Sequence, residues 1–173
     1  MVAGMSIPAG FPCRSCGQWH EGLPFSYGSP APAYWHDELA GDPNSALAEE
    51  LCVIEGEHFF VRARIVIPVV DGPGEFDWGV WVSLSHENFL RTLELWETSG
   101  RESEEPYFGW LSTEIPIYQP STLNLKTLVH TQPVGVRPVV ELEPTDHPLA
   151  VEQRTGITVA RVQEFAEQLL HQT

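Results

Sequence analysis

The chain has 173 residues, of which 42% are hydrophobic, so the composition argues against disorder and suits one domain with a sizeable core. Nine Lys and Arg stand against 24 Asp and Glu, which gives a formal net charge of −15. Such a negative field repels nucleic-acid phosphates and anionic lipid, and no stretch approaches the roughly 20 apolar residues that cross a bilayer. These features predict no nucleic-acid partner and no membrane partner.

Residues 1–10 lack the basic and apolar runs of a secretory signal, so we interpret them as a loose leader and expect a cytoplasmic protein. Residues 11–173 are expected to form a single domain. Its first part, residues 11–36, is rich in Pro, Gly and aromatic side chains and shows no lasting periodicity. An irregular segment of this kind needs a tie other than regular secondary structure, and a bound metal ion is one such tie.

In the middle of the chain, Ser45 is a good N-cap residue and predicts a short helix through about Leu51. Two strands then follow around a turn at Glu55-Gly56. The second strand has alternating apolar residues on one face and ends at Pro68; these residues are Val61, Ala63, Ile65 and Ile67. Residues 76–84 alternate in the same way, with Trp81 on the opposite face, where it is either covered by another layer or exposed for binding.

Beyond residue 84, Ser85 predicts the N-cap of a helix, and short strands are expected over 107–111, 123–129 and 136–142. A C-terminal helix is expected from about Thr158. Its apolar face comprises Val162, Phe165, Ala166, Leu169 and Leu170. Most connections between strands are too short for parallel crossovers. We therefore predict an α+β fold with a mainly antiparallel sheet, a few flanking helices and the irregular N-terminal Cys/His segment.

The strongest candidate site is the run from Cys13 to His20. Two thiolates at C-x-x-C spacing can chelate one ion, and His20 lies within reach. Structural zinc takes four nitrogen or sulfur ligands, so we predict a zinc site of Cys13, Cys16, His20 and Cys52. His36 remains an alternative fourth ligand.

His58 is a weaker candidate, because a turn that pairs Val53 with His58 puts Cys52 and His58 on opposite faces. The three cysteines could instead be free thiols, and a redox role for the C-x-x-C pair is a further reading.

A second group of polar residues lies between Thr145 and Gly156. Asp146, His147, Glu152 and Arg154 offer acid, base and guanidinium groups that could bind a ligand or do acid–base work. The simpler interpretation is a short helix with Asp146 or His147 as its cap, Pro148 in its first turn and Gly156 after its end.

Several long phrases extend over nearly the whole chain after about residue 10: FxCxxCGxxHEGLPFSYG, CVIEGEHFFVRARIVIPV, FDWGVWVSLS, PYFGWL, TLNLKT and EPTDHPLAVEQRTGIT. In these phrases the chain resembles the bacterial DUF2199 family. The resemblance implies a bacterial origin and one self-contained domain. Since the function of that family is unknown, it supplies no catalytic residues.

Three classes of function remain in view. The charge of −15 and the lack of a recognisable catalytic motif favour a non-catalytic protein-binding module, immunity-like or antitoxin-like, with a basic protein as its partner. The alternative is a small-ligand-binding protein or an enzyme that uses the Asp146–Arg154 segment. A structural or regulatory zinc protein is the third reading.

Overall fold

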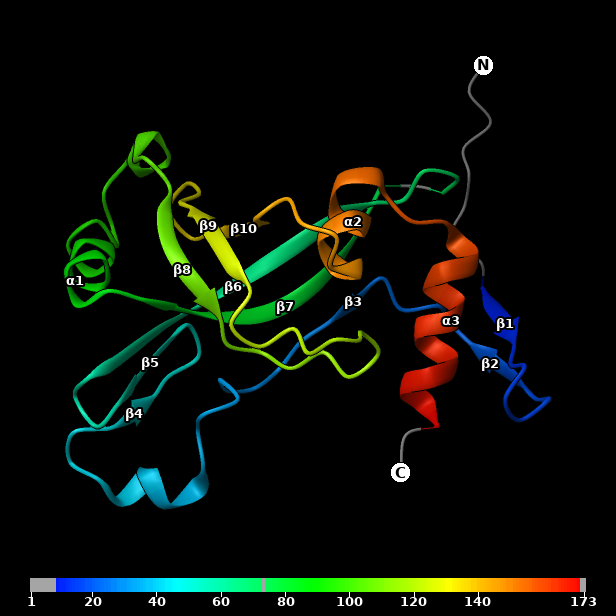
Figure 1. The fold of residues 1–173 in the computed structure, drawn as a ribbon, viewed down its shortest axis with the longest axis horizontal. Helices are drawn as coiled ribbons and strands as arrows, with labels where there is room; N and C mark the ends of the chain where they lie inside the picture. The colour runs from blue at the N-terminus through cyan, green and yellow to red at the C-terminus, as the bar shows by residue number, and fades with distance from the viewer. Residues whose placement is uncertain (1–8, 73, 172–173) are drawn as a thin grey trace.

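The structure, a computed structural model, describes residues 9–72 and 74–171 and shows an α+β fold built mostly of sheet (Figure 1). Most of the expected 1–10 leader therefore lies outside the described residues. The strands are β1 (Gly10–Pro12), β2 (Trp19–Glu21), β3 (Ser26–Tyr27), β4 (Ala46–Leu47), β5 (Leu51–Ile54), β6 (His58–Pro68), β7 (Glu75–Leu84), β8 (Tyr107–Leu111), β9 (Lys126–His130) and β10 (Val139–Leu142). The helices are η1 (Asp37–Gly41), α1 (His86–Glu94), η2 (Arg101–Ser103), α2 (Pro148–Thr155) and α3 (Val159–Leu170).

The α+β fold with a mostly sheet core is as expected, but the sheet differs from the expected mainly antiparallel one, because five of the described strands close on themselves. Strands β6, β7, β8, β9 and β10 pair in a ring, and we call this ring the barrel. The ring closes through a parallel contact between Val139 of β10 and Arg64 of β6. Strand β3 also runs parallel to β7, so the strand orientation is mixed. This closure depends on contacts between distant segments, which the spacing of apolar residues does not report.

The two long strands β6 and β7 supply most of the barrel interior, as their alternation predicts. They pair without interruption from Phe59 opposite Leu84 to Pro68 opposite Glu75. The inward residues of β6 and β7 are almost fully buried: Val61, Ala63, Ile65, Ile67, Phe76, Trp78, Val80 and Val82. The two strands are therefore the rigid element against which the helices pack.

A second, smaller apolar cluster lies on the other face of these strands and resolves the position of Trp81. Its buried members are Leu39, Cys52, Ile54, Phe60 and Trp81. The indole nitrogen of Trp81 donates to the carbonyl of Ser29 at 3.0 Å. Trp81 is thus covered by another layer, which residues 29–54 provide.

The predicted helix from Ser45 to Leu51 is wrong, because this segment contains β4 and the start of β5. The Ser45 hydroxyl donates to the Asp42 carboxylate at 2.6 Å and accepts from the backbone N–H of Glu55 at 2.7 Å. A turn held by Asp42 therefore uses the hydroxyl that a helix cap needs. The segment 11–36, expected to be irregular, likewise contains the β1–β2 hairpin and β3.

The three α-helices of the described residues lie where the sequence predicts helices, although Leu170, expected on the apolar face of α3, is 54% exposed. Ser85 accepts a hydrogen bond from Asn88 at the start of α1, and Thr158 accepts one from Arg161 at the start of α3. Phe165 of α3 is fully buried and packs against Phe76 with ring centroids 5.1 Å apart. In the part of the chain that the structure describes, no helix is both long and apolar enough to span a bilayer.

Candidate metal centre

The C-x-x-C segment forms the tight turn of the β1–β2 hairpin. Phe11 of β1 pairs with His20 of β2, and the backbone N–H of Cys13 donates to the carbonyl of Gln18 at 2.9 Å. The N–H of Gly17 donates to the carbonyl of Cys13 at 2.8 Å, and its φ of +74° favours glycine at this position. The turn directs both thiols toward one point beside His20.

Four side chains meet at this turn: Cys13, Cys16, His20 and His171. One potential ligand atom from each lies within 4.8 Å of all the others. The Sγ of Cys13 is 3.1 Å from Nε2 of His171, and the Sγ of Cys16 is 3.3 Å from Nε2 of His20. Two thiols and two imidazoles match the donor set of a four-coordinate structural metal site. We call these four residues the Cys/His cluster.

Helix α3 brings His171 to the hairpin from the other end of the chain, 158 residues after Cys13. In Figure 1 the hairpin lies alongside α3. The guanidinium of Arg14 contacts the buried carboxylate of Glu167 at 3.1 Å, and Gln163 donates to the carbonyl of Pro12 at 3.1 Å. The hairpin and α3 are thus joined by these two contacts as well as by the contact between Cys13 and His171 in the cluster.

The electrostatics of the turn favour a thiolate at Cys13. Burial by itself raises the pKa of this thiol, but hydrogen bonds from the backbone N–H groups of Cys16 and Ser15 and from the side chains of His171 and Cys16 lower its pKa to about 6. Because a metal binds the thiolate, a low pKa reduces the proton competition that the metal must overcome at neutral pH.

Cys52, predicted as the fourth ligand, does not belong to the Cys/His cluster. It lies in the second apolar cluster beside Trp81, is 1% exposed, and burial raises the pKa of its thiol to about 11. A buried neutral thiol in apolar surroundings behaves as a small hydrophobic group. The structure therefore replaces Cys52 with His171 in the proposed ligand set.

His36 and His58 also lie outside the Cys/His cluster. Ile54, not Val53, pairs with His58, so the β5–β6 register differs by one residue from the expected one. Glu55 and Gly56 both have positive φ, and the N–H of Glu57 donates to Ile54 at 3.1 Å. This tight turn fixes the register, and the expectation that Cys52 and His58 face opposite sides of the sheet does not hold.

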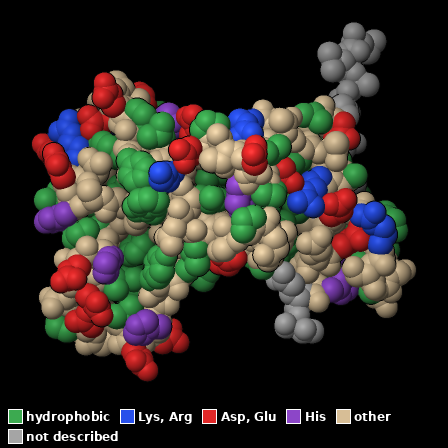
Figure 2. Space-filling model, viewed as in Figure 1, with side chains coloured by type: hydrophobic (Ala, Val, Ile, Leu, Met, Phe, Trp, Pro, Cys, Tyr) green, Lys and Arg blue, Asp and Glu red, His purple; other side chains and the backbone are tan. Residues whose placement is uncertain are grey.

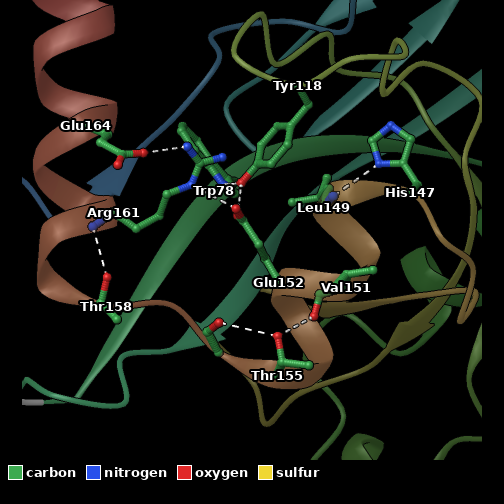
Figure 3. Close-up of polar contacts among 11 residues, drawn as sticks. Trp78, Tyr118, His147, Leu149, Val151, Glu152, Thr155, Thr158, Arg161 and Glu164 are labelled. Carbon is green, nitrogen blue, oxygen red and sulfur yellow. Dashed lines mark hydrogen bonds and ion pairs between the residues drawn. The ribbon is translucent and has the colours of Figure 1, made fainter.

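The Asp146–Arg154 segment forms α2 with the caps that its sequence predicts. His147 is the N-cap, Pro148 begins the helix and Gly156 follows its end. Nδ1 of His147 accepts from the N–H of Leu149 at 3.1 Å (Figure 3). Nε2 lies 2.8 Å from the carbonyl of Pro120. Since a carbonyl only accepts, Nε2 carries the proton. Both nitrogens of His147 are therefore committed to holding the backbone.

Glu152 points away from His147 and toward α3, as Figure 3 shows. Its carboxylate accepts from the hydroxyl of Tyr118 at 2.6 Å and from the guanidinium of Arg161 at 2.8 Å. The Tyr118 hydroxyl in turn accepts from the indole N–H of Trp78 at 3.2 Å. Burial and the Glu152 carboxylate raise the pKa of Tyr118 well above its ordinary range. These contacts join α2 and α3 to the barrel.

The other two residues predicted for this site, Arg154 and Asp146, make no contact with His147 or Glu152 among the hydrogen bonds described above. Arg154 donates to the carbonyl of Thr145 at 2.9 Å, and Asp146 is exposed. The structure thus assigns His147, Glu152 and Arg154 to three separate contacts. It does not bring the four predicted side chains together around one ligand.

Fold and site together define an α+β protein with a small closed sheet and a Cys/His cluster that has the donors to hold a metal ion. The chain belongs to the DUF2199 family, described as uncharacterized protein conserved in bacteria, whose model matches residues 12–157. Among curated proteins and among solved structures, nothing matches this chain. The match includes Cys13, Cys16 and His20 and ends before α3 and His171.

Proposed function

We propose that this protein is a non-catalytic binding module for a basic partner protein, built on a scaffold that one zinc ion stabilises. The observation that carries the binding function is an apolar patch on the outer face of two barrel strands. It consists of Phe108, Trp110 and Leu128, which are 46%, 42% and 39% exposed, and we call it the β8–β9 patch. Aromatic side chains left exposed together are typical of a protein-interaction surface.

The geometry of the patch supports this role. Phe108 lies directly opposite Leu128 across the two strands, and the rings of Phe108 and Trp110 make an edge-to-face contact at 5.1 Å. Lys126 lies across from Trp110 and Glu141 across from Leu128, so charged residues border the apolar centre. An apolar centre with a polar border is the usual anatomy of an interface.

Charge indicates the kind of partner. The chain carries a formal net charge of −15, and Figure 2 shows acidic side chains around the hydrophobic ones on the part of the molecule that contains β4, β5 and β8. A negative field accelerates encounter with a basic protein and slows encounter with an acidic one. An immunity-like or antitoxin-like role, in which the partner is a basic toxin, fits this chemistry.

A capture experiment tests the binding proposal. The wild-type protein and a Phe108→Ala/Leu128→Ala variant serve as baits, with Leu90→Ala/Leu93→Ala on α1 as a control that also truncates two exposed apolar side chains. The proposal expects a basic protein that the wild type and the control retain and the patch variant loses. A captured partner that binds all three baits equally well contradicts the proposed patch.

Zinc is the ion we propose for the Cys/His cluster. Two thiolates and two imidazoles form a Cys2His2 set, which zinc prefers in a tetrahedral arrangement, and the four residues come from two distant segments. The hairpin has two strands of only three residues each, so its own hydrogen bonds stabilise it little. A bound ion would stabilise the hairpin by linking it to α3.

Metal analysis tests this second part of the proposal. Protein purified under reducing conditions without added metal should contain about one zinc per chain. A folded, reduced protein with less than about a tenth of an equivalent contradicts a structural zinc, because such sites hold zinc tightly.

A further inference from the structure

A cleft of about 490 Å³ lies beside the β8–β9 patch, separate from the Cys/His cluster. Its walls come from four parts of the chain: the loop at Tyr34 and His36, the β5–β6 turn with the strand residues beside it, the end of β7 at Ser83 and Leu84, and the group of Trp110, Ser112 and Asn124. Its volume falls within the range of sites that take a small ligand.

Aromatic rings form two of its walls and are fixed in position. Tyr34 and Trp110 are 45% and 42% exposed. The Tyr34 hydroxyl donates to the side-chain oxygen of Asn124 at 2.9 Å, and its ring packs against Phe60 at 6.3 Å. The cleft therefore offers aromatic surfaces to a ligand without first rearranging.

Its charge is negative. Glu55 and Glu57, on the β5–β6 turn, line the cleft and are exposed, and neither makes an ion pair within the described part of the chain. No Lys or Arg is among the residues that line it, and the other ionisable side chains there are Tyr34, His36 and His58. Another cleft, of about 500 Å³, lies between the end of α1 and the loop that joins β9 to β10, and its lining includes three arginines and two glutamates.

We propose that this cleft binds one cationic side chain, an arginine or a lysine, of the basic partner protein. The inference rests on the proposed binding function, because it specifies which group of that partner the surface recognises. A guanidinium or ammonium would be stabilised by cation–π contacts with Tyr34 and Trp110 and by the carboxylates of Glu55 and Glu57. Arginine is preferred, since its planar guanidinium can stack on one ring while its N–H groups reach a carboxylate.

The position of the cleft fits this role. Trp110 belongs both to the β8–β9 patch and to the wall of the cleft. Ser83, opposite Trp110 in the sheet, also lines the cleft. A partner segment that lies on the patch can thus place a side chain in the cleft while it keeps its apolar contacts.

A pair of peptides tests the proposal on the full-length protein. One is a capped hexapeptide of arginine, and the other is the same peptide with citrulline, which has nearly the same shape but no charge. We expect calorimetry to detect binding of the arginine peptide and at least about tenfold weaker binding of the citrulline peptide.

Two double variants with the same change in net charge separate the cleft from the general field of the protein. Glu55→Gln/Glu57→Gln should weaken binding of the arginine peptide about fivefold or more, since each carboxylate contacts the ligand. Glu102→Gln/Glu105→Gln, on exposed residues outside the cleft, should change it by less than about twofold. Tyr34→Ala should weaken binding through the loss of its ring.

The inference is overturned if both glutamate pairs weaken the arginine peptide equally, or if the citrulline peptide binds as tightly. Its failure is distinct from failure of the proposed function. A natural partner that needs Phe108 and Leu128 but binds the Glu55→Gln/Glu57→Gln variant at full strength supports the β8–β9 patch and contradicts the role of the cleft. A partner that binds the Phe108→Ala/Leu128→Ala variant at full strength contradicts the proposal that the β8–β9 patch is the binding surface.

Discussion

His147 shows how a residue that looks reactive in the sequence is used to hold the backbone together. It caps α2 through Nδ1 and fixes the carbonyl of Pro120 through Nε2, and its side chain is 8% exposed. Each neutral hydrogen bond of this kind contributes about 1 kcal/mol to the free energy of unfolding, and an unpaired buried carbonyl costs more.

His147→Ala is therefore expected to lower the free energy of unfolding by about 2 kcal/mol, and His147→Asn, which keeps a capping oxygen, by less. Urea unfolding of the three proteins measures this. Partner binding should survive both changes. If His147→Ala abolishes the biological effect while folding and partner binding persist, a chemical role for α2 becomes the better account.

Tyr118 links stability to alkaline pH. Its pKa is raised above the ordinary value of about 10 by burial and by Glu152, so the fold favours the protonated phenol. A raised pKa means that the contribution of Tyr118 to stability is complete below about pH 10 and is lost as the pH rises further. We expect wild type to lose more stability than Tyr118→Phe between about pH 9.5 and 11. Parallel losses in the two proteins contradict this role.

Among the elements, α3 depends on its buried face. Phe165 is fully buried against Phe76 and Trp78, whereas Leu170, on the same helix, is 54% exposed. Phe165→Ala is expected to lower the free energy of unfolding by about 3–5 kcal/mol, and Leu170→Ala by less than about 0.5 kcal/mol, as measured by denaturant unfolding. A cost below about 0.5 kcal/mol for Phe165→Ala means that α3 does not dock as described.

The β1–β2 hairpin is expected to depend on the metal. A chelator should increase hydrogen exchange in residues 10–21 and at the end of α3, while β6 and β7 keep their protection, because these two strands pair with each other without interruption from Phe59 opposite Leu84 to Pro68 opposite Glu75. Exchange that stays unchanged after complete removal of zinc contradicts a structural role for the ion.

The elements that the sequence predicts well are those whose signal is local. Alternation in β6 and β7, the cap Ser85 and the helix from about Thr158 depend on neighbouring residues, and the structure confirms them. The helix predicted from Ser45 fails because its hydroxyl instead donates to Asp42 and accepts from the backbone N–H of Glu55. The closure of the barrel and the parallel pairing of β10 with β6 depend on contacts that no local pattern encodes.

The candidate site follows the same division. Three members of the Cys/His cluster lie within eight residues of each other, and their spacing alone predicts them. His171 stands alone near the C-terminus, and only the docking of α3 brings it to the hairpin. A signal was present in the apolar face of that helix, which predicts docking, but it does not say which segment the helix end meets.

At the scale of the whole molecule, the charge of −15 should govern the rate of association. An increase in ionic strength from about 0.01 to 0.15 M shortens the Debye length from about 30 to 8 Å and screens a long-range field. The association rate with the basic partner should therefore fall by about tenfold or more over this range, with a smaller change in the dissociation rate. An association rate independent of salt contradicts steering by the acidic surface.

The zinc content of two single variants tests the account most directly, since the account holds that His171 and not Cys52 completes the metal site. Both proteins are purified identically, equilibrated with a competing chelator and measured for zinc per chain. Cys52→Ala is expected to retain about one equivalent, and His171→Ala to lose most of its zinc, because a site with three protein ligands binds more weakly. Loss of zinc from Cys52→Ala with full retention in His171→Ala contradicts the proposed ligand set and the proposal that the zinc ion links α3 to the hairpin.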